Sequence, residues 1–139
     1  MENERFNPEH EGHKPLFEEL DMTDTWDEPS MLEKITTRLK ELGLYDENLI
    51  FRGIGQGELE SVRKKGVDKT KNFFATTESE MLNPISENSA LKYALDYPEP
   101  AVLVYDGSKF EKVSDYGYEL LEGESYLGSL KAVFALKMP

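Results

Sequence analysis

The chain has 139 residues, a net charge of −12 at pH 7 and no cysteine. This length fits one domain, and the lack of cysteine excludes disulfides, thiol catalysis and cysteine-based zinc sites. General binding to DNA or RNA needs a basic face, which this composition argues against. No apolar run approaches the roughly 18 residues of a membrane span, and no signal pattern is seen. We therefore expect a protein without membrane contact that is cytoplasmic in the cell that makes it, including a host cell if the chain is encoded by a phage.

The acidity is concentrated near the N-terminus, where ten acidic and two basic residues fall among the first 30. This stretch has few branched apolar residues, so it can bury little surface to offset its ordering entropy. We predict a flexible acidic arm over residues 1–29, of which 16–20 could dock as one short helical turn, and a single domain over 30–139. His10 and His13 lie in the arm without an evident third ligand, so we expect no metal site.

A first helix is predicted from residue 30. Ser30 and Glu33 form a capping-box pattern, and apolar residues then recur at helical spacing up to Leu42. Gly43 follows the last of them, which is typical of a helix end.

The rest of the chain alternates between strand and helix patterns. Because the helices are short and the later strands lie close together, we expect an α+β fold with a mixed sheet rather than a parallel α/β sheet. The predicted elements are a strand over 48–53, a helix over 57–65, a strand over 72–77, a helix over 86–97, a strand over 101–105, a polar loop over 116–126 and a strand over 129–137.

Arg52 stands at the end of a hydrophobic strand, where burying a guanidinium is unfavourable unless it is paired. Its partner is either an acidic side chain, such as a surface glutamate, or an anionic ligand, since guanidinium suits bidentate phosphate recognition. Thr76 and Thr77 end the next predicted strand. They fit either a simple turn that suits threonine or a pair of functional hydroxyls.

Glu122 and Glu124 flank Gly123 in a glycine-rich loop before the last strand. They are either solvated surface carboxylates or a pair that faces one site, because Gly123 lets the backbone bend. In such a pair one carboxylate can stabilise a developing cation while the other accepts a proton.

In this order, the three motifs resemble the Arg–Ser/Thr–Glu class of ADP-ribosyltransferases. The middle of the chain is also similar to small bacterial and phage members of that superfold, through Phe74-Ala-Thr76, the helical Ala90-Leu-Lys-Tyr-Ala94 and the strand 102–105. The resemblance covers residues 48–137. It implies a split β-sandwich of mixed strands with short flanking helices, which clamps NAD in a cleft.

The resemblance also implies a function and its residues. The protein would be an NAD-dependent mono-ADP-ribosyltransferase that modifies a protein acceptor. Glu124 would stabilise the oxocarbenium-like state, and Glu122 would orient or deprotonate the acceptor. The implied NAD-binding residues are Arg52 for a phosphate or the ribose, Gly53 for close approach to the nicotinamide amide, Thr76 or Thr77 to steady the catalytic glutamate, and Phe74 or Tyr93 to stack on the ring.

Other functions compete with this one. The chain could be a catalytically inactive, acidic interaction or inhibitor protein on the same fold, with the arm masking a basic partner. An RNA 2′-phosphotransferase would use NAD in a similar fold, but we expect it to need a more basic surface. The arm could also cover the protein's own cleft by pairing with Arg52 or with the basic residues of 64–71.

Overall fold

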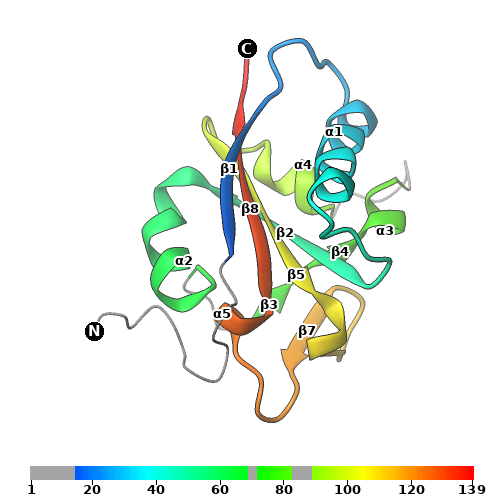
Figure 1. Cartoon of the computed structure of the whole chain (residues 1–139), viewed down its shortest axis with the longest axis vertical. Coiled ribbons are helices and arrows are strands. Elements are labelled where there is room, and N and C mark those ends of the chain that lie inside the picture. Colours follow the sequence, from blue (N-terminus) through cyan, green and yellow to red (C-terminus); the bar gives the residue numbers. More distant parts are fainter. Residues whose placement is uncertain (1–14, 69–71, 83–88) are drawn as a thin grey trace.

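The computed structural model describes residues 15–68, 72–82 and 89–139. It has an α+β fold in which two β-sheets are combined with short helices (Figure 1). A five-stranded mixed sheet has the order β1–β8–β5–β2–β4, and a three-stranded antiparallel sheet has the order β3–β7–β6. The strands are β1 (Leu16–Asp21), β2 (Leu49–Gly55), β3 (Phe73–Phe74), β4 (Thr76–Thr77), β5 (Pro100–Asp106), β6 (Phe110–Lys112), β7 (Gly117–Leu120) and β8 (Leu130–Lys137).

The helices are short apart from the first. They are α1 (Glu28–Glu41), α2 (Leu59–Lys65), α3 (Glu78–Leu82), α4 (Ala90–Ala94) and α5 (Tyr126–Ser129), with 3-10 turns η2 (Gln56–Glu58) and η3 (Gly107–Lys109). Among the described residues no helix is both long and apolar enough to cross a membrane. The cytoplasmic location stays a prediction.

The described part of the predicted arm belongs to the fold, so the prediction of a flexible segment up to residue 29 is wrong for 15–29. Residues 16–21 form β1, which pairs in parallel with β8 along its whole length and lies beside it in Figure 1. Met22, just beyond the strand, is fully buried, and its N–H donates to the Lys137 carbonyl over 2.8 Å. The composition of this segment offers little apolar surface to offset the entropy lost when it becomes ordered. Hydrogen bonds to a strand far along the chain offset that loss instead. Residues 1–14, with His10 and His13, lie outside the described residues.

The N-cap of α1 lies three residues before Ser30, the N-cap that the capping pattern predicts. Asp27 is the N-cap, and its carboxylate accepts from the Ser30 N–H over 3.0 Å, so Ser30 is already helical. Asp27 can take this role because its backbone is extended and its carboxylate reaches the first turn. The helix end is confirmed, since Gly43 adopts the left-handed conformation just after α1 at φ 73°.

The predicted strand 72–77 is split between the two sheets. Phe73 and Phe74 form β3 and pair with β7, whereas Thr76 and Thr77 form β4 and pair with β2. Ala75 lies between them, is buried, and donates its N–H to the Tyr116 carbonyl over 2.8 Å. The chain therefore crosses from one sheet to the other beside β2, and this crossing forms one wall of the candidate site.

Two hydrophobic cores lie on opposite faces of the five-stranded sheet. Alternate residues of β5 serve each of them: Val102 and Val104 face the core of α1 and α4, whereas Leu103 and Tyr105 face the core that contains β3 and β6. Figure 1 shows α1 and α4 on one side of the sheet and α2 on the other. Within the described part of the predicted helix 86–97, only Ala90–Ala94 are helical and form α4. The predicted polar loop 116–126 instead contains β7 and the first residue of α5.

Candidate functional site

A pocket of about 820 Å³ opens where the chain crosses between the sheets. This volume is in the usual range for small-molecule sites, roughly 300–1,000 Å³. Five of the eight residues predicted from the sequence line it, and they come from three separate stretches of chain. The lining residues are Arg52, Gly53, Asn72, Phe74, Ala75, Thr76, Ala90, Tyr93, Ser114, Asp115 and Tyr116.

Arg52 is held by an acidic partner inside the domain. Its Nε and Nη2 donate to the two oxygens of Asp68 over 2.8 and 3.2 Å, and its Nη1 donates to the Phe74 carbonyl over 2.8 Å. The side chains of this ion pair are only 12% and 13% exposed. The ion-pair interpretation therefore holds, with Asp68 in place of a surface glutamate. These bonds engage three of the five guanidinium N–H donors, so an anion in the pocket would draw on the others.

Aromatic rings support Arg52 from behind. The guanidinium carbon lies 5.1 Å from the centre of the Phe73 ring, which meets Tyr105 edge-on at 5.0 Å. Burial raises the pKa of Tyr105 well above its usual value, so its hydroxyl stays protonated and donates to the Gly66 carbonyl over 2.7 Å. This packing fixes where the guanidinium can point.

Gly53 is required by helix packing. A Cβ at this position would lie 2.0 Å from the Ala90 carbonyl oxygen and 2.8 Å from the Ala94 nitrogen, so α4 already fills the space that a side chain would need. The glycine thus lets α4 approach β2, which differs from the expected role of admitting the nicotinamide amide. The residue still lines the pocket.

The two threonines have different roles. Thr76 is 1% exposed, lines the pocket, and accepts the Ala90 N–H on its hydroxyl over 2.9 Å. Thr77 forms a capping box with Glu80: its N–H donates to the Glu80 carboxylate over 2.8 Å, and its hydroxyl accepts the Glu80 N–H over 3.2 Å. Thr77 does not line the pocket. Of the two alternatives, Thr76 is the one placed at the site.

Thr76→Val should lower the free energy of unfolding by about 1–2 kcal/mol, because the buried Ala90 N–H loses its acceptor while the side-chain volume is kept. Thr77→Val removes only the cap of a short helix and should cost about 0.5–1 kcal/mol. Urea unfolding of both variants measures the difference. A larger loss for Thr77→Val would contradict these roles.

Two aromatic rings stand at the pocket. Phe74 and Tyr93 are 52% and 57% exposed, and both line it. Tyr93 also meets Tyr97 edge-on at 6.0 Å. Their exposed faces can stack against a planar ligand.

The structure does not bring Glu122 and Glu124 to this pocket. They lie in the turn between β7 and α5, where Gly123 has φ 86° and allows the bend that the sequence predicts. The Glu124 carboxylate lies 3.6 Å from the Lys109 ammonium. The predicted catalytic pair is thus separate from the predicted NAD-binding residues.

The carboxylate that does line the pocket is Asp115, which sequence reasoning missed. Its turn between β6 and β7 is tied by the Val113 N–H to the Gly117 carbonyl over 2.9 Å and by the Gly117 N–H to the Ser114 hydroxyl over 3.1 Å. The Ala75 N–H anchors the turn to the sheet crossing through Tyr116. The Ser-Asp-x-Gly sequence indicates a turn that could present an acidic side chain. It points to this site only if a strand follows the turn, and the sequence predicts a loop in place of β7.

The fold and the pocket define an α+β protein with a ligand-sized site that holds an arginine, a carboxylate and two open aromatic rings. No protein-family model, no curated protein and no solved structure matches this chain. In the part of the chain that the structure describes, no group of three or more acidic or histidine side chains is placed to hold a metal ion.

Proposed function

We propose that the pocket binds NAD and that the protein is an NAD-dependent ADP-ribosyltransferase that acts on a protein acceptor. The observation that carries this proposal is the convergence of Arg52, Phe74, Thr76 and Tyr93 on one pocket. The resemblance to ADP-ribosyltransferases implies an NAD-binding role for each of these residues, and they come from β2, the sheet crossing and α4. A pocket between a five-stranded and a three-stranded sheet also fits a split β-sandwich of the ADP-ribosyltransferase kind.

The pocket has groups suited to each part of the nicotinamide half of NAD. The exposed faces of Phe74 and Tyr93 can stack on the planar ring. The Arg52 donors that Asp68 and Phe74 leave open can bind a phosphate or ribose oxygen. Because Asp68 already neutralises part of the guanidinium charge, we expect modest NAD affinity.

Transfer of ADP-ribose also needs a carboxylate near the ribose. The bond between the ribose C1′ and the nicotinamide nitrogen breaks, nicotinamide leaves with the electron pair, and positive charge develops on the ribose. The acceptor nucleophile then bonds to C1′ and gives its proton to a base. In this pocket we assign the charge-stabilising carboxylate to Asp115, in place of Glu124, because Asp115 lines the site and its turn is held by hydrogen bonds.

The test is NAD binding by calorimetry together with nicotinamide release, for wild type, Asp115→Asn and Glu124→Gln. We expect Asp115→Asn to lower turnover by about 100-fold while NAD affinity changes little, because the neutral amide keeps the shape but loses the charge. Glu60→Gln, on an exposed residue of α2, is the matched control and should have no effect. Loss of turnover in Glu124→Gln alone would return the catalytic role to Glu124, and no NAD binding by wild type would end the proposal.

A catalytically inactive interaction protein on the same fold is the second candidate. It is favoured by the placement of Glu122 and Glu124 outside the pocket and by the ion pair that already engages Arg52. NAD binding without nicotinamide release would support it. Deletion of the acidic arm as a test of this idea must stop before Leu16, because removing β1 would strip an edge strand from the sheet.

A further inference from the structure

We propose that a second hollow, formed by α1 and the end of β1, binds an arginine-bearing segment of a partner protein. This hollow, the α1 groove, has a volume of about 620 Å³ and lies between α1 and the loop that leads into it from β1. It shares no lining residue with the NAD pocket. It is lined by Leu20, Asp21, Asp24, Thr25, Trp26, Asp27, Ser30, Glu33, Lys34, Thr37, Arg38 and Glu41.

Trp26, the chain's single tryptophan, lines the α1 groove with its side chain 83% exposed. Its loop is anchored before Trp26, where Met22 is fully buried and the Thr25 N–H donates to the Met22 carbonyl over 3.0 Å. After Trp26 the chain is anchored by Asp27, the N-cap of α1. The indole is therefore presented to solvent by a structured loop. Leaving so large an apolar surface exposed is unfavourable, and tryptophan is enriched among the residues that dominate protein interfaces.

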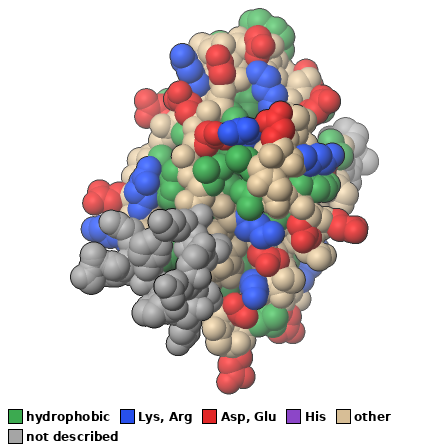
Figure 2. Space-filling view, in the orientation of Figure 1, with side chains coloured by type: hydrophobic (Ala, Val, Ile, Leu, Met, Phe, Trp, Pro, Cys, Tyr) green, Lys and Arg blue, Asp and Glu red, His purple; other side chains and the backbone are tan. Residues whose placement is uncertain are grey.

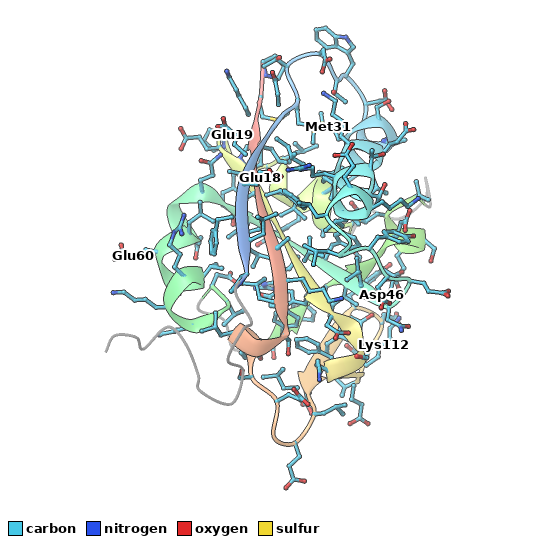
Figure 3. The ribbon with its side chains drawn as sticks, viewed as in Figure 1. Glu18, Glu19, Met31, Asp46, Glu60 and Lys112 are labelled. Atoms are coloured by element: carbon cyan, nitrogen blue, oxygen red, sulfur yellow. The ribbon has the colours of Figure 1, made fainter. Side chains whose placement is uncertain are left out.

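The cations of the groove are already paired. Lys34 lies 2.6 Å from Asp24, and Arg38 donates two hydrogen bonds of 2.7 Å to Glu18 on β1 as well as pairing with Glu41 at 3.1 Å. Figure 3 marks Glu18 on β1, and Figure 2 shows acidic and basic side chains interspersed over this face. The groove's own positive charge is thus used to hold α1 against β1.

Acidic groups in the groove outnumber the basic ones. Asp21, Asp27 and Glu33 remain beyond those ion pairs, so the lining carries a net negative charge. Hydrogen bonds from Thr23 lower the pKa of Asp21, which keeps that carboxylate ionised at neutral pH. Glu33 is exposed on α1 and makes no ion pair among the described residues. Such a lining attracts a cationic partner and repels nucleic acid and anionic membranes.

Arginine fits this combination better than lysine. Its planar guanidinium can stack on the indole of Trp26 and still donate two parallel hydrogen bonds to a carboxylate such as Glu33. A lysine ammonium is a strongly hydrated point charge, so it can neither stack flat on the indole nor donate two parallel hydrogen bonds to a carboxylate. The groove therefore points to a basic protein segment that contains arginine.

The test is a titration of the whole chain with a capped peptide of alternating arginine and glycine, followed by tryptophan emission. Because Trp26 is the only tryptophan, its emission reports directly on the groove. We expect a change in emission at low salt, weaker binding as salt is raised, and weaker binding of the matching lysine–glycine peptide.

Two charge reversals locate the binding surface. Glu33→Lys should weaken binding of the arginine peptide about tenfold, whereas Glu60→Lys, the same change on exposed α2, should leave it within about twofold. Trp26→Ala should also weaken peptide binding, as measured by calorimetry. Because Trp26 is exposed, we expect this variant to fold normally, so weaker binding would reflect the lost indole. Equal effects of the two reversals, binding without a change in emission, or no binding at low salt would each overturn the proposal. None of these outcomes depends on NAD.

Discussion

Gly53→Ala should destabilise the protein by about 3 kcal/mol, the upper end of the usual effect of overpacking a core. The added Cβ would lie 2.0 Å from the Ala90 carbonyl oxygen, a backbone atom that cannot rotate away, so α4 would have to move off β2. Urea unfolding followed by circular dichroism measures this loss. Because α4 also carries Tyr93, the same substitution should weaken any ligand that stacks on that ring.

Gly57→Ala is the matched control for this prediction. Nothing lies within 4 Å of a Cβ at Gly57, which sits in the 3-10 turn after β2. Its effect on stability should stay within about 0.5 kcal/mol, as expected of an open surface position. Similar unfolding midpoints for the two variants would show that α4 does not need the close approach to β2.

Arg52→Ala should have an effect of similar size, about 3 kcal/mol, since removing one partner of a buried ion pair leaves the other charge uncompensated. Asp68→Ala should be comparably damaging, and the double variant should lose less than the sum of the two. The side chains are 12% and 13% exposed, and the guanidinium donates two hydrogen bonds to Asp68. Unfolding free energies of the three variants complete the cycle.

The exposed pair of Lys64 and Glu60 is the control for the buried one. Its side chains are 69% and 82% exposed and 3.5 Å apart, so Glu60→Ala should cost less than about 1 kcal/mol. Additive losses at Arg52 and Asp68 would contradict the coupling. Because Arg52→Ala is expected to destabilise the fold, a loss of NAD binding in this variant can be assigned to the pocket only after the variant is shown to be folded.

The local elements were largely predictable from sequence. The apolar runs of β2, β5 and β8 and the glycines that end α1 and α2 are visible in the residue order, because each depends on neighbours a few positions away. The placement of β1 could not be predicted in this way, because β1 pairs with β8, which lies more than 100 residues further along the chain. The same holds for β7, whose partners β3 and β6 turn a polar stretch into a strand.

For the candidate site, the sequence predicted which residue types would bind NAD: an arginine after a buried strand, threonines, aromatic rings and a pair of glutamates. Only the tertiary structure decided which of them meet. It brings Arg52, Thr76 and Tyr93 to one pocket, pairs Arg52 with Asp68, and places Asp115 rather than Glu124 at that pocket. The reason is physical: a side chain's chemistry belongs to its residue, but its neighbours are set by how strands pair across the sheet, which a linear pattern does not record.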